Sequence, residues 1–83
     1  KGASLLPSGI LSVQGEFAAG DTLNIINAES GIIIAKGISQ YNSRDLSKIS
    51  GKKSEQIVEI LGFCPSKVIV HRDDMVLMPN KAK

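Results

Sequence analysis

Residues 68–76 constrain the fold of this 83-residue chain more than any other stretch. Residues 68–70 are three consecutive β-branched side chains, a pattern that favours a buried strand. Four polar or ionisable residues follow at 71–74, and a regular strand would point about half of them into the core, because alternate side chains face opposite sides. The sequence therefore predicts that the backbone turns here and that the carboxylates bond to nearby amides or to Arg72.

Asp73 and Asp74 are adjacent carboxylates, a pair that can in principle bind a metal ion or share a proton. Neighbouring side chains in extended backbone point apart, however, and no other acid or second histidine lies close in sequence. Structural ion pairs also produce such clusters. We therefore interpret Arg72, Asp73 and Asp74 as a structural polar cluster, and we predict no metal-binding and no catalytic residue in the chain.

Composition predicts one small domain with an aliphatic core. Apolar residues make up 42% of the chain, yet it contains no Trp, one Tyr and two Phe. A single cysteine, Cys64, excludes a disulfide framework and a four-cysteine zinc site, and it fits a half-buried packing residue in a reducing cytoplasm. No apolar run approaches the roughly 20 residues of a membrane span, and no signal peptide is recognisable. We expect a fragment of a larger cytoplasmic protein, with one domain at 1–78 and a frayed tail at 79–83.

The hydrophobic pattern predicts strands first, then two short helices, then a closing strand. Residues 27–31 are typical of a hairpin connection, with Gly31 available for positive φ, and Gly37 indicates a bulge or bend. Asn42 or Ser43 can cap a first helix, and Ser54 can cap a second. The expected strands are 10–13, 22–26, 32–38 and a segment that begins near Lys67, and the expected helices end at Gly51 and Gly62. This order defines a mainly β, α+β fold.

The chemistry that the chain can offer is limited to positive charge and two aromatic rings. Gly51–Lys52 invites comparison with a phosphate-binding loop, but Leu46 and Lys53 stand where that loop needs glycine and Ser or Thr. The net charge of +2 does not by itself indicate nucleic acid. Composition alone favours scattered surface lysines as the explanation. The side chains available for phosphate contact are Lys36, Arg44, Lys48, Lys52, Lys53, Lys67 and Arg72, and Tyr41 and Phe63 are the candidate stacking platforms.

Several segments taken together resemble one known module. They are 4–10 (Ser-Leu-Leu-Pro-Ser-Gly-Ile), 15–17 with 20–21, 34–38, 41–43, 60–62 and 70–76 (Val-His-Arg-Asp-Asp-Met-Val). This set is similar to the C-terminal PUA domain of bacterial glutamate 5-kinase, a domain type named for pseudouridine synthases and archaeosine transglycosylases. The resemblance covers nearly the whole chain. Its first and last segments are the most specific.

The resemblance implies a PUA-like pseudobarrel of about five to six strands with two short helices between the late strands. A leading strand and most of a helix would precede residue 1. It also implies a parent enzyme in which this chain is joined to an amino-acid-kinase domain. That domain would carry the catalysis and would bind ATP and Mg²⁺. That enzyme, a homo-oligomer, would make L-glutamyl 5-phosphate in the first step of proline biosynthesis.

For this chain the resemblance implies an accessory or regulatory role without a cofactor. An RNA-binding module, attached to the kinase or derived from an RNA-modifying enzyme, is the alternative. In RNA-modifying relatives the glycine-containing loop and the final strand grip RNA, which points to Pro7, Ser8 and Gly9 and to His71 and Arg72. With the lysines of the charge pattern, the candidate RNA-facing residues are Pro7, Ser8, Gly9, Lys36, Lys52, Lys53, His71 and Arg72, and the expected binding is weak.

Overall fold

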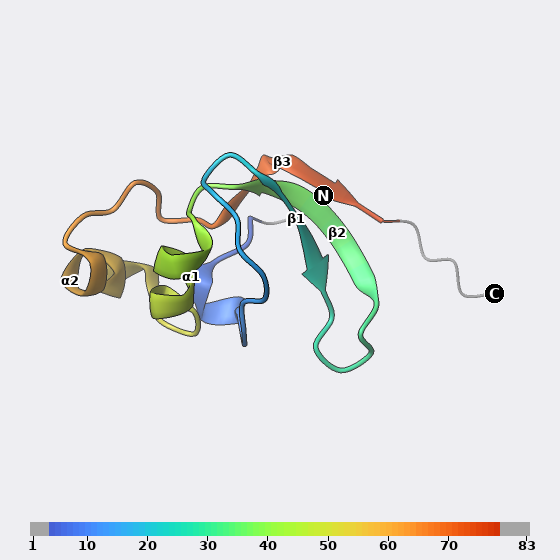
Figure 1. Cartoon of the computed structure of the whole chain (residues 1–83), viewed down its shortest axis with the longest axis horizontal. Helices are drawn as coiled ribbons and strands as arrows, with labels where there is room; N and C mark the ends of the chain where they lie inside the picture. The colour runs from blue at the N-terminus through green and yellow to red at the C-terminus, as the bar shows by residue number, and fades with distance from the viewer. Residues whose placement is uncertain (1–3, 79–83) are drawn as a thin grey trace.

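The computed structural model describes residues 4–78 and confirms the α+β class. Helices and sheet occupy opposite ends of an elongated molecule (Figure 1). The elements, in chain order, are the 3-10 turn η1 (Pro7–Gly9), strands β1 (Thr22–Ile26) and β2 (Ile33–Ser39), helix α1 (Ser43–Ile49), the 3-10 turn η2 (Ser54–Gln56), helix α2 (Ile57–Leu61) and strand β3 (Val70–Leu77). The expected tail at 79–83 lies outside the described residues.

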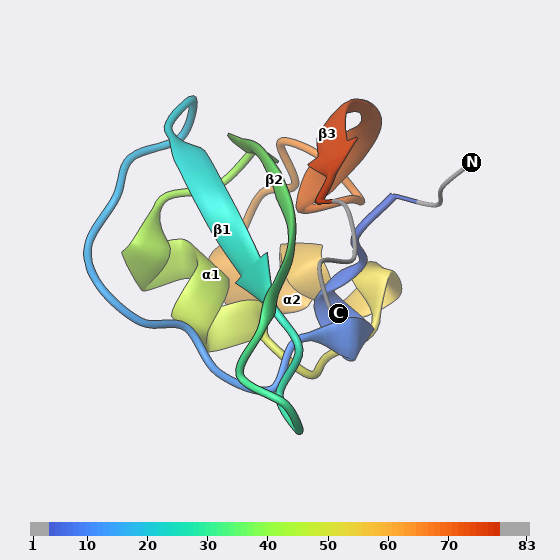
Figure 2. The same ribbon diagram turned by 90° about the vertical axis from the view of Figure 1, so that its right-hand side faces the viewer.

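The three strands form one antiparallel sheet in the order β1-β2-β3. Strand β2 curves along its length (Figure 1), and in the end-on view β1 and β2 pass in front of the helices (Figure 2). The expected five to six strands are therefore not found within residues 4–78, which hold three strands and one isolated bridge between Leu5 and Val70. Residues 10–13, expected to form a strand, are a loop, because they have no strand partner and Leu11 is exposed to solvent.

The β1–β2 hairpin confirms the turn that the sequence predicts. The Asn27 N–H donates to the Ile32 carbonyl (2.9 Å) and the Gly31 N–H donates to the Asn27 carbonyl (2.8 Å). The Asn27 side-chain oxygen also accepts the N–H groups of residues 29 and 30. Gly31 has φ +76°, a conformation that costs glycine little, so the connection is encoded locally.

Strand β3 corrects the prediction of a turn at 71–74. The strand begins at Val70 rather than near Lys67 and continues through the polar residues to Leu77. Its pairing with β2 shifts between Gly37, which faces Met75, and Ser39, which faces Val70. Residues 71–74 thus lie opposite the single residue Ile38, in a wide bulge. The polar side chains lie outside the core, as expected. A bulge in the strand, rather than a turn, keeps them exposed.

Gly37 marks this bulge, as the sequence predicts, because no side chain fits there. A Cβ at position 37 would lie 3.2 Å from the Asp74 carbonyl oxygen and 3.5 Å from the Met75 Cα, and closer still to a Val70 methyl group. Val70 is fully buried. Glycine therefore lets the bulged strand approach β2 backbone to backbone.

The two helices begin and end much as predicted. Asn42 caps α1, and its side-chain oxygen accepts the Asp45 N–H (2.8 Å). Ser54 does not cap the second helix. Its hydroxyl instead donates to the Lys67 carbonyl (2.9 Å), and Lys53 occupies the cap position of η2. Gly62 ends α2 in the left-handed conformation.

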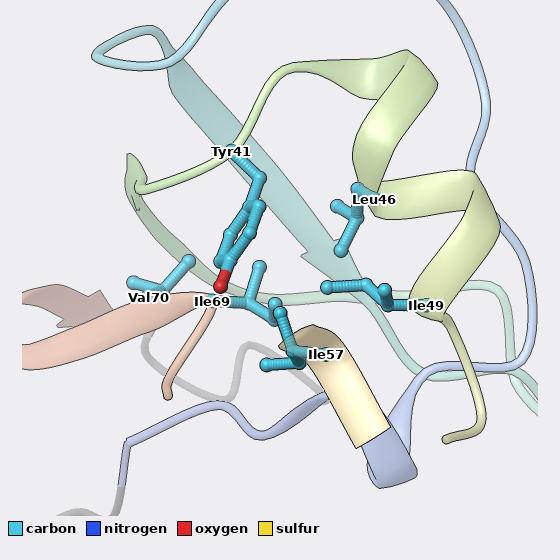
Figure 3. Close-up of a cluster of buried hydrophobic side chains, with 6 residues drawn as sticks. All are labelled: Tyr41, Leu46, Ile49, Ile57, Ile69 and Val70. Atoms are coloured by element: carbon cyan, nitrogen blue, oxygen red, sulfur yellow. The ribbon is translucent and has the colours of Figure 1, made fainter. Parts of the chain in front are cut away.

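The core lies between the helices and the start of β3 (Figure 3). Its buried hydrophobic residues are Tyr41, Leu46, Ile49, Ile57, Ile69 and Val70, an aliphatic set around one phenol ring, as composition predicts. Tyr41 is therefore not the exposed stacking platform that we expected, whereas Phe63 is exposed. Cys64, expected to be half-buried, is also exposed. Within residues 4–78 no helix is long and apolar enough to cross a bilayer.

Candidate nucleic-acid interface

The N-terminal segment, residues 4–9, connects two of the predicted RNA-facing groups. The Leu5 N–H donates to the Val70 carbonyl (2.9 Å) and the Ile69 N–H donates to the Leu5 carbonyl (2.7 Å). At its other end the Pro7 carbonyl accepts the Gly51 N–H (2.7 Å). These backbone bonds place the start of β3 on one side of the segment and the α1–η2 linker on the other.

The turn η1 presents a small exposed loop beside the linker lysines. The Gly9 N–H donates to the Leu6 carbonyl and the Ile10 N–H donates to the Pro7 carbonyl, each at 3.1 Å. Pro7 is buried, whereas Ser8 and Gly9 are exposed, and a Cβ at Gly9 would meet nothing within 4 Å. Lys52 and Lys53 are exposed in the adjoining linker. The exposed residues 8 and 9 therefore lie close to the linker that carries both lysines.

His71 and Arg72 lie at the other end of the same segment. The Arg72 N–H donates to the Ser4 hydroxyl oxygen (3.0 Å). His71 Nδ1 accepts the Asp73 N–H at 3.3 Å and lies 3.6 Å from an Asp73 carboxylate oxygen. His71 Nδ1 can accept the hydrogen bond from the Asp73 N–H only when Nδ1 carries no proton. An ion pair with the Asp73 carboxylate requires Nδ1 to be protonated, so the two contacts exclude each other. Both side chains are exposed, and an ion pair between them contributes little to stability.

The predicted cluster of Arg72, Asp73 and Asp74 is not brought together. Within residues 4–78 neither carboxylate contacts Arg72, and all three residues are exposed along the bulge. Lys36 also lies apart from the other candidates. It faces Asn24 on one side and Val76 on the other, in the middle of the sheet. Of the eight predicted residues, three lie within residues 4–9, four lie beside the two ends of that segment, and Lys36 lies apart.

An open groove of about 690 Å³ lies beside the start of α1 and was not predicted from the sequence. Glu16, Phe17, Arg44 and Ser47 are among its lining residues. The Ser43 N–H donates to the Phe17 carbonyl (2.9 Å) and the Phe17 N–H donates to the Ser43 hydroxyl oxygen (3.2 Å). These two bonds hold the loop against the helix. No sequence motif joins residues so far apart, so only the fold reveals the groove.

The surroundings of Tyr41 perturb the pKa of its phenol. Burial raises the pKa of the Tyr41 phenol above its ordinary value of 10.0, and the Ser66 backbone partly offsets this rise. The phenol donates to the Ser66 carbonyl, and the Ser66 N–H approaches the phenol oxygen at 3.4 Å. Tyr41 therefore anchors the loop before β3 to the core and stays neutral at physiological pH.

The surface around residues 4–9 carries exposed cations. Among residues 4–78 no three side chains of the His, Cys, Asp and Glu type come together to hold a metal ion. Lys52, Lys53 and Arg72 are the cations of this surface. The fold and this surface together define a small α+β domain built on an arched antiparallel sheet.

Comparison with known proteins identifies its family. A family model described as the PUA domain matches residues 1–61, and the chain belongs to the PUA domain family. Curated relatives named glutamate 5-kinase match it too. The chain is 48% identical over 79 residues to the one from Salinibacter ruber, 49% over 78 to the one from Shewanella halifaxensis, and 50% over 76 to the one from Sinorhizobium fredii.

These matches cover most of this chain and little of each relative. They span 92–94% of the chain but 19–21% of the relatives' length. The matched part is the C-terminal region of those proteins. The resemblance seen in the sequence is thereby confirmed, and the chain spans about a fifth of the length of the curated relatives that it matches.

Proposed function

We propose that this chain is the accessory, non-catalytic PUA domain of a glutamate 5-kinase. The observation that carries the proposal is the match of nearly the whole chain, at 48–50% identity, to the C-terminal region of relatives with that name. The parent uses ATP to make L-glutamyl 5-phosphate, the first step of proline biosynthesis, in the cytoplasm and as a homo-oligomer. The domain modulates or stabilises the amino-acid-kinase domain to which it is joined.

The stretch of this chain that most resembles a phosphate-binding loop does not fit ATP and Mg²⁺. The one phosphate-loop-like stretch begins at Gly51, and the Gly51 N–H is already bonded to the Pro7 carbonyl (2.7 Å), so it cannot cradle a phosphate oxygen. Lys53 also stands where such a loop needs a hydroxyl for the metal. ATP and Mg²⁺ therefore belong to the kinase domain of the parent, and no step of phosphoryl transfer uses a residue of this chain.

Glutamate-dependent ATP turnover tests this proposal. The full-length polypeptide that contains the chain should phosphorylate glutamate, and the 83-residue chain alone should not exceed the uncatalysed background. A control without glutamate separates phosphoryl transfer from contaminating ATP hydrolysis. Turnover by the chain alone that survives further purification, or a full-length polypeptide that is inactive with glutamate, would contradict the proposal.

RNA binding is a second candidate function, favoured by the grouping of cations around residues 4–9. Lys52 and Lys53 lie beside the exposed loop at 8–9, and Arg72 lies at the other end of the segment. Each phosphate neutralised on a single strand contributes about −0.7 to the slope of log affinity against log salt, so three cations give about −2. The affinity at physiological salt should be micromolar or weaker, the range of non-specific binding.

Fluorescence anisotropy with a structured RNA at two salt concentrations measures both quantities. Replacing Lys52 and Lys53 by Gln should reduce the slope by about 1.4, because two phosphate contacts are lost. Lys36→Gln is the matched control, since Lys36 lies apart on the sheet, and it should leave the slope unchanged. Nanomolar binding insensitive to salt would show a different, specific mode. No binding at any salt would remove this candidate.

A further inference from the structure

The groove beside the start of α1 has walls that hydrogen bonds hold in place. The loop between η1 and β1 runs past α1 (Figure 2), and Phe17 is bonded to Ser43 through both its N–H and its carbonyl. Further along the loop, the Gly20 N–H donates to the Ser39 carbonyl (2.8 Å) and the Ser39 N–H donates to the Asp21 carbonyl (2.9 Å). The groove is therefore formed before a ligand arrives, as small-molecule sites usually are.

Two side chains of opposite charge line this groove without neutralising each other. Arg44 belongs to the first turn of α1 and Glu16 to the loop, and both are exposed. Within residues 4–78 neither side chain forms an ion pair. A guanidinium binds a phosphate group through two parallel N–H donors, whereas a carboxylate accepts hydrogen bonds from hydroxyl groups. The two charges therefore suit a ligand with an anionic group at one end and hydroxyl donors elsewhere.

The uncharged lining residues suit a flat, polar ring system. Phe17 is half-buried, because it packs against the core and also lines the groove. An accessible aromatic ring is a surface on which a nucleobase can stack. The Asn42 side-chain oxygen accepts the Asp45 N–H (2.8 Å), which leaves its NH₂ group as a donor to the ligand. Ser47 lies three residues after Arg44, on the same side of α1, and adds a hydroxyl group.

The size of the groove and its single cation narrow the class of ligand. Its volume of about 690 Å³ lies within the range of about 300–1,000 Å³ that is typical of sites for small organic molecules. One lining cation matches one phosphate group, whereas a polyphosphate would bring further negative charge close to Glu16. The first amides of α1 offer little, since the Ser43 and Asp45 N–H groups are already bonded to Phe17 and Asn42.

We propose that this groove binds a nucleoside monophosphate unit, with the phosphate on Arg44, the base on Phe17 and the sugar hydroxyls on Glu16. The unit is a free nucleotide or an unpaired nucleotide of an RNA, since both present the same three groups. The groove shares no residue with the cationic surface around residues 4–9. It is formed by residues of this chain alone, so the site does not depend on the identity of the parent enzyme.

Two-dimensional ¹H–¹⁵N NMR spectra of the 83-residue chain, titrated with adenosine monophosphate (AMP), test this site. Saturable shifts are expected at the amides of Phe17 and residues 43–47, with a dissociation constant of about 0.1–1 mM, because an open groove buries only part of its ligand. Arg44→Gln should weaken AMP binding about tenfold and leave adenosine binding unchanged, since adenosine has no phosphate. Phe17→Leu should weaken AMP binding about tenfold and leave ribose 5-phosphate binding unchanged, since ribose 5-phosphate has no base.

Lys36→Gln is the matched control for Arg44→Gln. It also removes one positive charge, but from the middle of the sheet, and it should leave the affinity for AMP unchanged. The same spectra show whether each variant is folded. If Phe17→Leu unfolds, the comparison of AMP with ribose 5-phosphate in the wild type decides whether the base is recognised.

Several results would overturn the site. They are the absence of saturable shifts at millimolar AMP, shifts at residues 7–9, 52 and 53 in place of the groove, and equal binding of AMP and ribose 5-phosphate by the wild type. Equal shifts with glutamate would show a site for zwitterions and would also overturn it. A single-stranded oligoadenylate identifies the source of the nucleotide: binding in the groove tighter than that of AMP supports an RNA, and weaker binding supports a free nucleotide.

Discussion

Replacing Gly37 by Ala tests how the bulge in β3 is accommodated. Gly37 does not need a left-handed backbone, so alanine can adopt its conformation, and the effect of the substitution is steric. The added Cβ would lie well inside 3.0 Å of a Val70 methyl group and 3.2 Å from the Asp74 carbonyl oxygen. Val70 is fully buried and Asp74 contributes backbone, so neither can move away freely.

The expected cost follows from overpacking. Forcing one extra methyl group into a well-packed site typically costs about 1–3 kcal/mol. Alanine recovers about 0.4–1 kcal/mol because it restricts the unfolded chain. The net loss of unfolding free energy should therefore be about 1.3 kcal/mol at the middle of both ranges, and at most about 2.6 kcal/mol. In a domain of this size each kcal/mol of lost unfolding free energy lowers Tm by about 4–8 °C.

Thermal melts of the 83-residue chain, followed by circular dichroism, measure this shift. Gly9→Ala is the matched control, because a Cβ there meets nothing within 4 Å, and it should melt at or slightly above the wild-type temperature. Val70→Ala removes the methyl group that clashes. The double variant Gly37→Ala/Val70→Ala should therefore be more stable than the sum of the single effects, by about 0.5–3 kcal/mol. A Gly37→Ala variant that melts like Gly9→Ala would refute the reasoning.

Substitutions at three further positions test other contacts. The unfolded state ionises Tyr41 first as pH rises above 10.0, so stability should be constant below that pH and fall above it, and melts of Tyr41→Phe should show a smaller fall. At neutral pH Tyr41→Phe should cost about 0.5–1.5 kcal/mol through the lost bond to Ser66. Asn42→Ala removes the cap of α1 and should cost about 1 kcal/mol in urea unfolding, whereas Asn42→Asp should cost much less. Gly51→Ala should cost about 1–2 kcal/mol because Gly51 has φ +79°, and an unchanged urea midpoint would show that the linker relaxes.

Features encoded by neighbouring residues could be predicted from the sequence. The alternation at 22–26, the Asn27 turn and the Asn42 cap each depend on residues within one turn or one strand, and the structure contains all three. Residues 10–13 have the same apolar character but no partner strand, and β propensity without pairing does not make a strand.

Features that depend on contacts between distant residues could not be predicted. The polar run at 71–74 had to avoid the core, but a bulge differs from a turn only through the pairing of β3 with Gly37 and Ser39. The burial of Tyr41 likewise depends on its packing against core residues as distant as Ile69 and Val70, which no local pattern reveals. The sequence also predicted most of the candidate residues around the N-terminal segment. The hydrogen bond from the Gly51 N–H to the Pro7 carbonyl, which places two of these groups side by side, is visible only in the fold.

The bridge between Leu5 and Val70 has a consequence for how the chain is synthesised. Its two partners are almost the whole domain apart in sequence, and both backbone bonds of Leu5 go to residues 69 and 70. Until Val70 has left the ribosome, the first segment has nothing to pair with and the core lacks two of its buried side chains. Contacts of such long range make folding slow. The domain therefore closes only after its last strand has been translated, and a nascent chain stalled before β3 would expose an incomplete core to chaperones.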